Sequence, residues 1–335
     1  MLALMSHSES PDLLHPVCPN VNQYTRMATT PRSQLVDSQL PMHYHLISRC
    51  VRRAWLCGYD KNSRKKYDHR KGWLEDRLFH LARYFAIDLD AYAIMSNHFH
   101  LVVYYDPLVC HNWDAAEVAR RWTEAFPPRV SPDYPQDLEA LQALRREEIL
   151  KNPRRLEQIR LTLGSLSDFM KHLKQPVAWR ANREDQCTGH FFEGRFYSGA
   201  LLSEQAVLAA MAYVDLNPVR AKICEAIDGY AHTSAYRRLQ HLENSPERLQ
   251  ELMRPLVSGI SNPLEPKPQL MILEDYIRHL RMLSRFSESH MTDAEAIWFN
   301  RVASLSKRQR AYGLLGELQD WVARHGWRRT GNALA

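Results

Sequence analysis

The sequence predicts an α+β fold with a ferredoxin-like core, and three observations support this prediction. First, once residues 106–164 are set aside as an insertion, the patterning follows the order strand, helix, strand, strand, helix, strand, helix, which contains the split βαβ arrangement. Second, only Ser96 and Asn97 separate two strand-like stretches, a spacing that favours a tight hairpin. Third, a chain of 335 residues with 45% apolar and 24% charged residues has a globular composition.

The elements before the insertion follow from local patterns. The stretch HYHLISRCV, residues 43–51, is typical of a strand. Residues 72–87 have apolar side chains near one side of a helix and therefore predict an amphipathic helix. LDAYAIM at 89–95 and HFHLVVYY at 98–105 are the two strands of the expected hairpin.

The elements after the insertion complete the pattern. Residues 165–184 are expected to be helical, with Pro176 kinking or offsetting the helix because proline lacks an N–H group. A strand is expected over residues 190–201, and a helix over residues 203–216. Ser203 is a suitable N-cap for that helix, since its hydroxyl can accept a hydrogen bond from the first turn.

Composition divides the chain into three parts. Residues 1–40 are polar, contain Pro, Ser and Thr, and are expected to be mostly disordered. Residues 41–238 hold the patterned core, whose insertion at 106–164 is interrupted by prolines and contains a charged helix. Residues 239–335 are predicted to form a helical C-terminal extension.

Composition also disfavours several classes of protein. No apolar run is long enough to cross a bilayer, and the N-terminus lacks the order of a secretion signal, so we expect a cytoplasmic protein that does not contact membranes. The six cysteines form no C-x-x-C pair, which argues against a disulfide framework and a structural zinc site. The formal net charge is +6, and basic residues concentrate in the segment 49–71. A solvated loop and a nucleic-acid surface are both compatible with that segment.

A pair of histidines is the first candidate functional feature. Side chains alternate between the two faces of a strand, so His98 and His100 lie side by side on one face, together with Val102. Neutral imidazoles are good ligands for a divalent ion, and two of them on one rigid surface can reach the same ion. Hydrogen-bonded, partly buried histidines without a metal remain the alternative.

A tyrosine on the helix expected at 203–216 is the second candidate. Tyr213 and Asn217 are four residues apart and therefore lie near each other on a helix face. Alanines precede them on or near that side, so the helix can approach whatever the tyrosine faces. An ordinary packed tyrosine followed by a helix stop is the alternative, because a residue that precedes a proline, here Pro218, disfavours helical geometry.

The H-x-H strand and the Tyr-x-x-x-Asn helix together resemble the single-tyrosine HUH transposases, in particular the REP-associated tyrosine transposases. Four stretches carry the resemblance, in the order of the family: YHLISRCVRRAWLCG, YAIMSNHFHLVV, GHFFEGRFYSGALL and MAYVDLNPVRA. They lie within about residues 41–236. The resemblance therefore covers the core and neither terminal extension.

This resemblance implies a ferredoxin-like nuclease core that acts on single-stranded DNA, commonly beside a hairpin. Carried over position by position, it makes His98 and His100 metal ligands and Tyr213 the nucleophile. Asn217 matches the polar third ligand, where other branches of the family carry glutamine. The implied ion is Mg²⁺ or Mn²⁺. The protein would be a monomer or a homodimer, since in dimeric relatives the tyrosine helix can serve the partner's metal site.

The implied chemistry uses each of these groups. A metal ion polarises the scissile phosphate and orients the leaving 3′ oxygen. The phenol of Tyr213, with an unperturbed pKa of about 10, loses its proton as it attacks phosphorus. The products are a 5′-phosphotyrosine and a free 3′-hydroxyl. A DNA 3′-hydroxyl can later displace the tyrosine, so the reaction can transfer strands without ATP.

Other side chains near these motifs are candidates for DNA binding or for catalysis. Guanidinium groups match phosphate geometry, and four arginines are candidates for DNA binding, with structural ion pairing as the alternative for each. These candidates are Arg49, Arg52, Arg53 and Arg195. Three further tyrosines lie on the expected strands but lack a helix-borne asparagine partner, so Tyr213 ranks first. These tyrosines are Tyr104, Tyr105 and Tyr197.

Two other functions fit the same residues. A domesticated DNA-hairpin-binding protein would use the fold and the basic surface without mobilising any DNA. A metal-dependent RNA-processing nuclease on a ferredoxin-like fold would cut RNA and form no covalent protein–DNA adduct.

Overall fold

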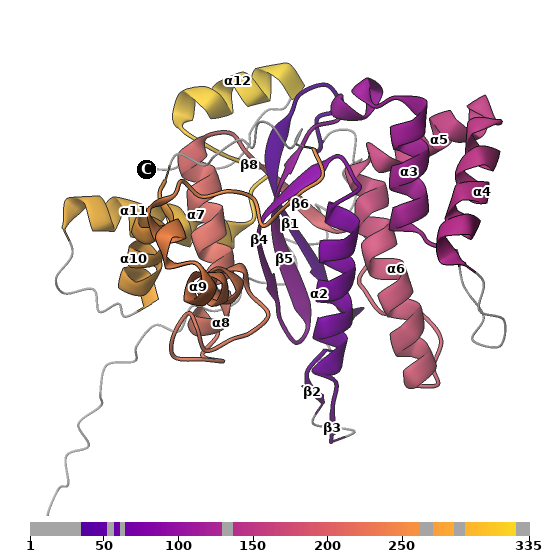
Figure 1. The fold of residues 1–335 in the computed structure, drawn as a ribbon. Coiled ribbons are helices and arrows are strands. Elements are labelled where there is room, and N and C mark those ends of the chain that lie inside the picture. Colours follow the sequence, from indigo (N-terminus) through magenta and orange to yellow (C-terminus); the bar gives the residue numbers. More distant parts are fainter. Residues whose placement is uncertain are drawn as a thin grey trace, which may run out of the picture.

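A six-stranded sheet forms the centre of the molecule, in the order β7-β4-β5-β1-β6-β8 (Figure 1). The fold is known from a computed structural model, which describes residues 35–51, 57–60, 64–128, 137–260, 271–284 and 292–325. The strands are β1 (Met42–Arg49), β4 (Ile87–Ile94), β5 (His98–Tyr105), β6 (Tyr197–Leu201), β7 (Val257–Ser258) and β8 (Ala311–Tyr312). A separate ribbon pairs β2 (Tyr59–Asp60) with β3 (Lys65–Lys66). The mixture of helices and sheet agrees with the predicted α+β class.

The four longest strands of this sheet pair antiparallel. β4 and β5 form the predicted hairpin, closed by a hydrogen bond of 2.8 Å from the backbone N–H of Met95 to the carbonyl of His98. β1 lies between β5 and β6, and its register places Arg49 opposite His98 and Ile47 opposite His100. The histidine pair therefore lies near the end of the sheet where β1 ends and β5 begins.

Helices cover both faces of the sheet (Figure 1). α2 (His69–Ala82) and α6 (Leu166–Glu184) pack on one face, where Leu46, Leu101 and Val103 belong to a common apolar core. α7 (Glu204–Asp215) packs on the other face against a second core that includes Val102. Adjacent residues of β5 therefore contribute to opposite cores, as the alternation predicts.

Two elements differ in extent from their predictions. The helix predicted at 72–87 ends at Ala82, because Phe85 and Ile87 continue the apolar pattern as a buried turn and the start of β4. The strand predicted at 190–201 is confined to β6. Phe191 and Phe192 are consecutive and both buried in the same core, an arrangement that the alternating faces of a regular strand do not allow. α6 continues through Pro176.

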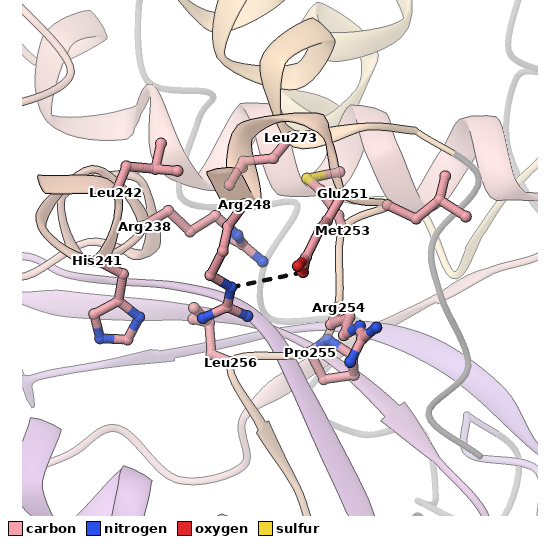
Figure 2. A pocket seen from close by; sticks show the side chains of 11 residues that line it. Arg238, His241, Leu242, Arg248, Glu251, Met253, Arg254, Pro255, Leu256 and Leu273 are labelled. Atoms are coloured by element: carbon pink, nitrogen blue, oxygen red, sulfur yellow. Dashed lines mark ion pairs between the residues drawn. The ribbon is translucent and has the colours of Figure 1, made fainter. Parts of the chain in front are cut away.

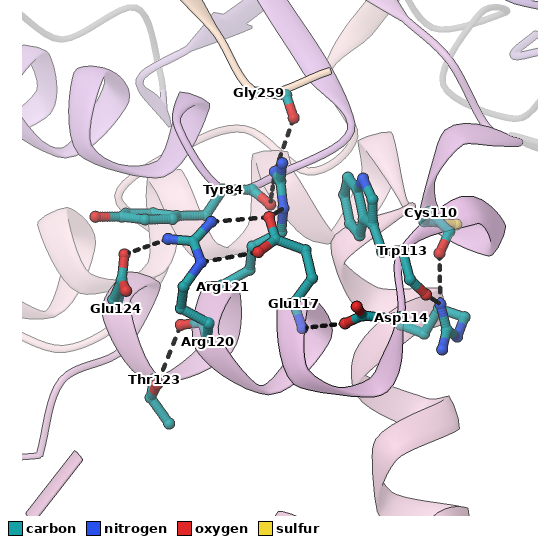
Figure 3. Close-up of polar contacts among 11 residues, drawn as sticks. Tyr84, Cys110, Trp113, Asp114, Glu117, Arg120, Arg121, Thr123, Glu124 and Gly259 are labelled. Atoms are coloured by element: carbon teal, nitrogen blue, oxygen red, sulfur yellow. Dashed lines mark hydrogen bonds and ion pairs between the residues drawn. The ribbon is translucent and has the colours of Figure 1, made fainter. Parts of the chain in front are cut away.

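The insertion forms a helical layer beside α6 (Figure 1). Its elements are η3 (Val109–Asn112), α3 (Ala115–Ala125), α4 (Leu138–Leu150) and α5 (Pro153–Leu163). Figure 3 shows how α3 is fixed: Arg121 donates to the carbonyls of Gly259 at 2.7 Å and Tyr84 at 3.2 Å, while Glu117 pairs with Arg120 and Arg121. Trp113 is buried beneath Arg121, whose guanidinium carbon lies 4.0 Å from the centre of the indole ring. The insertion therefore packs as part of the folded body.

Within its described residues, the C-terminal extension contains helices and also two short strands, which the helical prediction did not include. Its helices are α9 (Ser234–Asn244, at its start), η4 (Pro246–Gln250), α10 (Leu273–Ser284), α11 (Asp293–Ser304), η6 (Leu305–Lys307) and α12 (Leu315–His325). β7 pairs antiparallel with β4, and β8 pairs parallel with β6. The extension thus adds a strand to each edge of the core sheet.

A small cavity of about 140 Å³ lies between α9, η4 and the segment that leads to β7 (Figure 2). Arg238 reaches it from α9 and donates to the backbone carbonyl of Asp90 on β4 at 2.6 Å. Arg248 faces the cavity and pairs with Glu251 at 3.6 Å. These contacts join the extension to the sheet.

None of the helices in the described part of the chain combines the length and the apolar character of a membrane span. Of the segment predicted to be disordered, residues 1–34 lie outside the described residues.

Candidate active site

The sheet and α7 bring the predicted site residues together. His98 and His100 lie on the face of β5 that is turned to α7, next to Val102 in the core on that side. Four of the α7 side chains that are buried in the core on this face are alanines, and Ala91 and Ala93 of β4 belong to the same core. Small side chains on both surfaces let the helix lie close to the strands. Ser203 caps α7 as predicted, accepting a hydrogen bond of 3.3 Å from the N–H of Ala206.

Asn217 lies just beyond α7, as the first residue of the short helix α8 (Asn217–Arg220). Its side-chain nitrogen Nδ2 is 3.2 Å from Nε2 of His100. The spacing of four residues from Tyr213 therefore places the amide at the histidine pair, although a helix boundary separates the two residues.

A third histidine completes this cluster. Nε2 of His45, on β1, is 2.9 Å from Nδ1 of His100, and the two rings stack with an interplanar angle of 19°. His45 is fully buried. His45 was not among the predicted site residues, because its contact with His100 depends on the pairing of β1 with β5. The signal was a second H-x-H, formed by His43 and His45 on the neighbouring strand.

The hydrogen bonds assign the protons of the two candidate ligands. Nδ1 of His98 is 2.6 Å from Oδ1 of Asn97, so Nδ1 carries the proton and Nε2 keeps its lone pair. The amide of Asn217 donates to Nε2 of His100, so His100 carries its proton on Nδ1 and donates to His45. Both histidines of β5 therefore present an Nε2 lone pair. Hydrogen bonds that fix the second nitrogen in this way are typical of metal-binding histidines.

The three imidazoles are neutral at pH 7. Burial lowers the pKa of His45 and of His98 to about 3, and it lowers the pKa of His100 well below its ordinary value. Positive charges add to this effect: Arg308 acts on all three histidines, and Arg49 acts on the two of β5. Neutral imidazole is the form that binds a metal ion.

These pKa values predict how the stability of the metal-free protein depends on pH. As the pH falls from about 6.5 toward about 3, histidines of the unfolded chain take up protons before those of the folded site, so the free energy of unfolding decreases. Each fully shifted histidine contributes about 1.4 kcal/mol per pH unit within this window. Urea denaturation with a chelator present, at about pH 7 and about pH 5, measures the effect. His45→Gln should flatten the dependence by about one proton, and an unchanged slope would contradict the assignment.

Tyr213 faces the histidine cluster. Its ring centre is 5.8 Å from those of both His45 and His100, and the guanidinium carbon of Arg220 on α8 lies 5.4 Å from it. The side chain is partly exposed, so a substrate can reach it. These positions are compatible with the predicted nucleophile, with a cation beside it.

Tyr197 is the competing tyrosine nearest to the cluster, with its ring 6.0 Å from that of His45. Its hydroxyl donates to the backbone carbonyl of Gln309 and lies 2.8 Å from the hydroxyl of Tyr312. Burial raises the pKa of the Tyr197 phenol well above its ordinary value, and the neighbouring Tyr312 adds to the shift. Tyr197 is therefore a structural tyrosine and a poor nucleophile, which favours Tyr213.

The two histidines of β5 suit a divalent ion if the side-chain amide of Asn217 acts as a third ligand. Among the described residues, no group of three or more His, Cys, Asp or Glu side chains is arranged to hold a metal. The candidate donors are Nε2 of His98, Nε2 of His100 and the amide of Asn217. An amide binds a cation through its oxygen, whereas Nδ2 faces His100, so metal binding requires the amide to turn.

The predicted DNA-binding arginines have different positions. Arg49 lies opposite His98 in the register of β1 and β5, within the site. Arg195 is exposed in the loop before β6. Arg52 and Arg53 lie outside the described residues. Of the basic segment 49–71, Arg70 is fully buried and pairs with two carboxylates that end α6, so its role is structural ion pairing.

A buried polar network holds the end of α7 in place. The carboxylate of Asp215 accepts hydrogen bonds from the hydroxyl of Ser234 and the backbone N–H of Ala235, both at the start of α9. It also accepts one from the hydroxyl of Tyr276, at 2.7 Å. Burial raises the pKa of Asp215, while the charge of Arg238 lowers it. The C-terminal extension thereby fixes the helix that carries Tyr213.

Tyr276→Phe should destabilise the protein by about 1–3 kcal/mol, because it leaves a buried carboxylate oxygen without its donor. Urea denaturation monitors the change. Tyr236→Phe on α9 serves as the comparison, since Tyr236 is only partly buried and its loss should cost less than about 0.5 kcal/mol. Equal effects of the two substitutions would contradict a special role for the Asp215 network.

Comparison with known proteins yields a distant likeness. Neither protein-family models nor curated proteins match the sequence. Among solved structures, "Structure of the REP associates tyrosine transposase bound to a REP hairpin" is similar at 10% identity and a TM-score of 0.33, and the match covers 59% of this chain and 79% of that chain. The side chains of the site are therefore the basis on which a function can be assigned.

Proposed function

We propose that the protein is a metal-dependent DNA strand transferase of the single-tyrosine HUH kind, similar to the REP-associated tyrosine transposases. The observation that carries this proposal is the convergence of three neutral histidines, an asparagine amide and a partly exposed tyrosine on one face of the sheet. These groups come from three separate parts of the sequence: β1, β5 and the segment that joins α7 to α8. A packed core alone does not require polar groups at all these positions.

The strand order supports the proposed ferredoxin-like core. β4, β5, β1 and β6 lie side by side and antiparallel, with α2 between β1 and β4 in the chain and α6 between β5 and β6. Both helices cover the same face (Figure 1). This is the arrangement expected of a split βαβ fold, with the opposite face left for the site.

In the proposed reaction, Oη of Tyr213 attacks the phosphorus of a DNA phosphodiester. The new bond joins phosphorus to Oη, the bond from phosphorus to the 3′ oxygen breaks, and the phenol proton passes to water. The leaving 3′ oxygen takes up a proton and becomes a hydroxyl. A bound Mg²⁺ or Mn²⁺ ion, held by His98, His100 and Asn217, would neutralise the negative charge that develops on the phosphate.

The chain's own residues prepare this step. Nε2 of His45 bonds to Nδ1 of His100 and holds that ring so that Nε2 of His100 faces Asn217. Tyr213 and the histidines belong to one chain, so a monomer contains every proposed group. A homodimer with exchanged helices is not needed to assemble the site.

A groove on the α6 side supports binding of an unpaired strand. It has a volume of about 740 Å³ and is lined by α6 and the segment 189–196. Trp179 lines it and is 63% exposed, which suits stacking of a base, while Lys174 and Arg195 supply positive charge. The N–H of Glu193 donates to the carbonyl of Arg49 at 2.7 Å, so the groove adjoins the site end of β1.

The test uses a labelled DNA hairpin with a single-stranded flank, incubated with Mg²⁺ or Mn²⁺. We expect a covalent adduct that survives denaturation, and mass spectrometry should locate a 5′-phosphonucleotide on the peptide that contains Tyr213. The RNA version of the same hairpin should give no adduct. Binding without an adduct would favour the hairpin-binding protein, and metal-dependent cutting of RNA would favour the RNA nuclease.

A further inference from the structure

Arg308 reaches the candidate site from outside the part of the chain that carries the family resemblance. It lies between η6 and β8 in the C-terminal extension. Its guanidinium carbon is 5.9 Å from the ring centre of Tyr197, and that ring is 6.0 Å from the ring of His45. β8 pairs parallel with β6, so the sheet itself carries this arginine to the site.

The backbone next to Arg308 is held by hydrogen bonds of both the carbonyl and the N–H of Gln309. The carbonyl of Gln309 accepts a hydrogen bond from the hydroxyl of Tyr197, and its N–H donates to the hydroxyl of Tyr312 at 2.8 Å. The two tyrosine hydroxyls also bond to each other at 2.8 Å. The segment thus holds its position before any ligand arrives, which is a requirement for electrostatic preorganisation.

Gly199 on β6 makes room for this fastening. A Cβ atom at this position would lie 2.4 Å from the hydroxyl oxygen of Tyr197 and 2.8 Å from the ring of Tyr312. Gly199 also faces His45 in the register of β1 and β6. Because Gly199 has no side chain, β6 leaves space between His45 and the C-terminal extension, and the side chains of Tyr197 and Tyr312 occupy that space.

The backbone of Arg308 has a left-handed conformation, with φ of 47° and ψ of 71°. Glycine and asparagine adopt this region at lower cost than arginine. Residues that keep such a conformation cluster at functional sites. Position 308 therefore has an arginine although its left-handed backbone conformation favours glycine or asparagine.

Guanidinium groups approach the site from more than one element. Arg308 lies beside Tyr197, whose ring is next to that of His45, and Arg49 lies opposite His98 in the register of β1 and β5. Arg220 adds a further guanidinium 5.4 Å from the ring of Tyr213. Neutral imidazoles surrounded by guanidinium groups form a site prepared for an anion.

We propose that Arg308 binds the scissile phosphate beside Tyr213, so that the C-terminal extension completes the active site. This inference rests on the proposed function. Its guanidinium stabilises the charge on the non-bridging oxygens as the phosphorus passes from the 3′ oxygen to the phenol, and it forms no covalent bond itself. The extension is then part of the catalytic unit.

The test compares Arg308→Asn, Arg308→Lys and Lys307→Ala in the full-length protein. Asparagine tolerates the left-handed backbone, so the first variant should fold, and urea denaturation checks this. Lys307 is the adjacent exposed cation, and its loss changes the net charge by the same amount. The readouts are the salt dependence of affinity for the single-stranded hairpin substrate and the rate of adduct formation.

We expect Arg308→Asn to reduce the slope of log affinity against log salt by about 0.7, the loss of one phosphate contact on a single strand. The adduct rate should fall by about 10²-fold or more. Arg308→Lys should retain the slope and lose about 10-fold in rate, because lysine lacks the planar fork. Lys307→Ala should resemble the unchanged protein in both measurements.

The outcomes separate this proposal from the proposed function. If Arg308→Asn changes neither the rate of adduct formation nor the salt slope, the role of Arg308 would be overturned and the proposed function would stand. If the unchanged protein forms no adduct but Arg308→Asn still lowers the salt slope, the phosphate contact of Arg308 would be supported and strand transfer would be rejected. Equal losses in Lys307→Ala and Arg308→Asn, or no DNA binding by the unchanged protein, would overturn the inference.

Discussion

Tyr213→Phe is expected to lower covalent capture of DNA by at least about 10³-fold, because it removes the only atom of this side chain that can attack phosphorus. DNA binding should persist, since the ring that lies 5.8 Å from His45 and His100 is retained. The measurement is the amount of denaturation-resistant adduct on the hairpin substrate, with affinity determined in parallel. Loss of capture with retained affinity assigns the hydroxyl to chemistry.

Tyr104→Phe is the matched control for this experiment. Tyr104 lies on β5, on the same face as the two histidines, with its ring 4.9 Å from that of His43. It therefore tests whether any phenol near the strand suffices. Full capture by Tyr104→Phe is expected, and capture that survives in Tyr213→Phe would reject the assigned nucleophile.

The groups that sequence reasoning predicted are those with a local periodicity. Alternation along one strand placed His98 and His100 on the same face, and the structure places them there. A spacing of four residues placed Asn217 near Tyr213, and the amide does lie at His100. Each prediction needed only the geometry of one element.

The groups that were missed depend on contacts between distant elements. His45 bonds to a residue 55 positions away, and the pairing of β1 with β5 decides that contact. Arg308 follows a three-residue 3₁₀ helix and precedes a two-residue strand, and neither is long enough to show a periodic pattern. The consecutive buried Phe191 and Phe192 likewise resembled a strand, because burial by tertiary packing has no fixed period.

The cations of the site bear on how a metal ion binds. Arg49 and Arg308 both act on the histidines of β5, so a divalent ion enters a region that is already positive. A DNA phosphate between the ion and the guanidinium groups would offset that repulsion. We therefore expect metal affinity and DNA affinity to be coupled, each ligand favouring the other by the same factor.

The double variant His98→Gln His100→Gln is expected to lose this coupled metal binding and to lower adduct formation by about 10³-fold, since a metal ion contributes several kcal/mol to charge stabilisation in such a transfer. Glutamine retains a polar side chain that can bond to His45 and Asn217, so the neighbours of His100 keep a partner. Calorimetric titration with Mn²⁺, with and without an uncleaved hairpin, measures the binding. Unchanged denaturation by urea would show that the fold is intact.

The single variant His43→Gln is the matched control for the metal experiment. His43 lies on β1 as the other half of the second H-x-H, but its neighbours are the carboxylate of Asp90, at 3.5 Å, and the ring of Tyr104, at 4.9 Å from ring centre to ring centre. It should retain both Mn²⁺ binding and adduct formation. Adduct formation by the double variant at the unchanged rate, or by the unchanged protein in excess chelator, would show that the histidine pair holds no catalytic metal, and Tyr213 would then depend on the guanidinium groups alone.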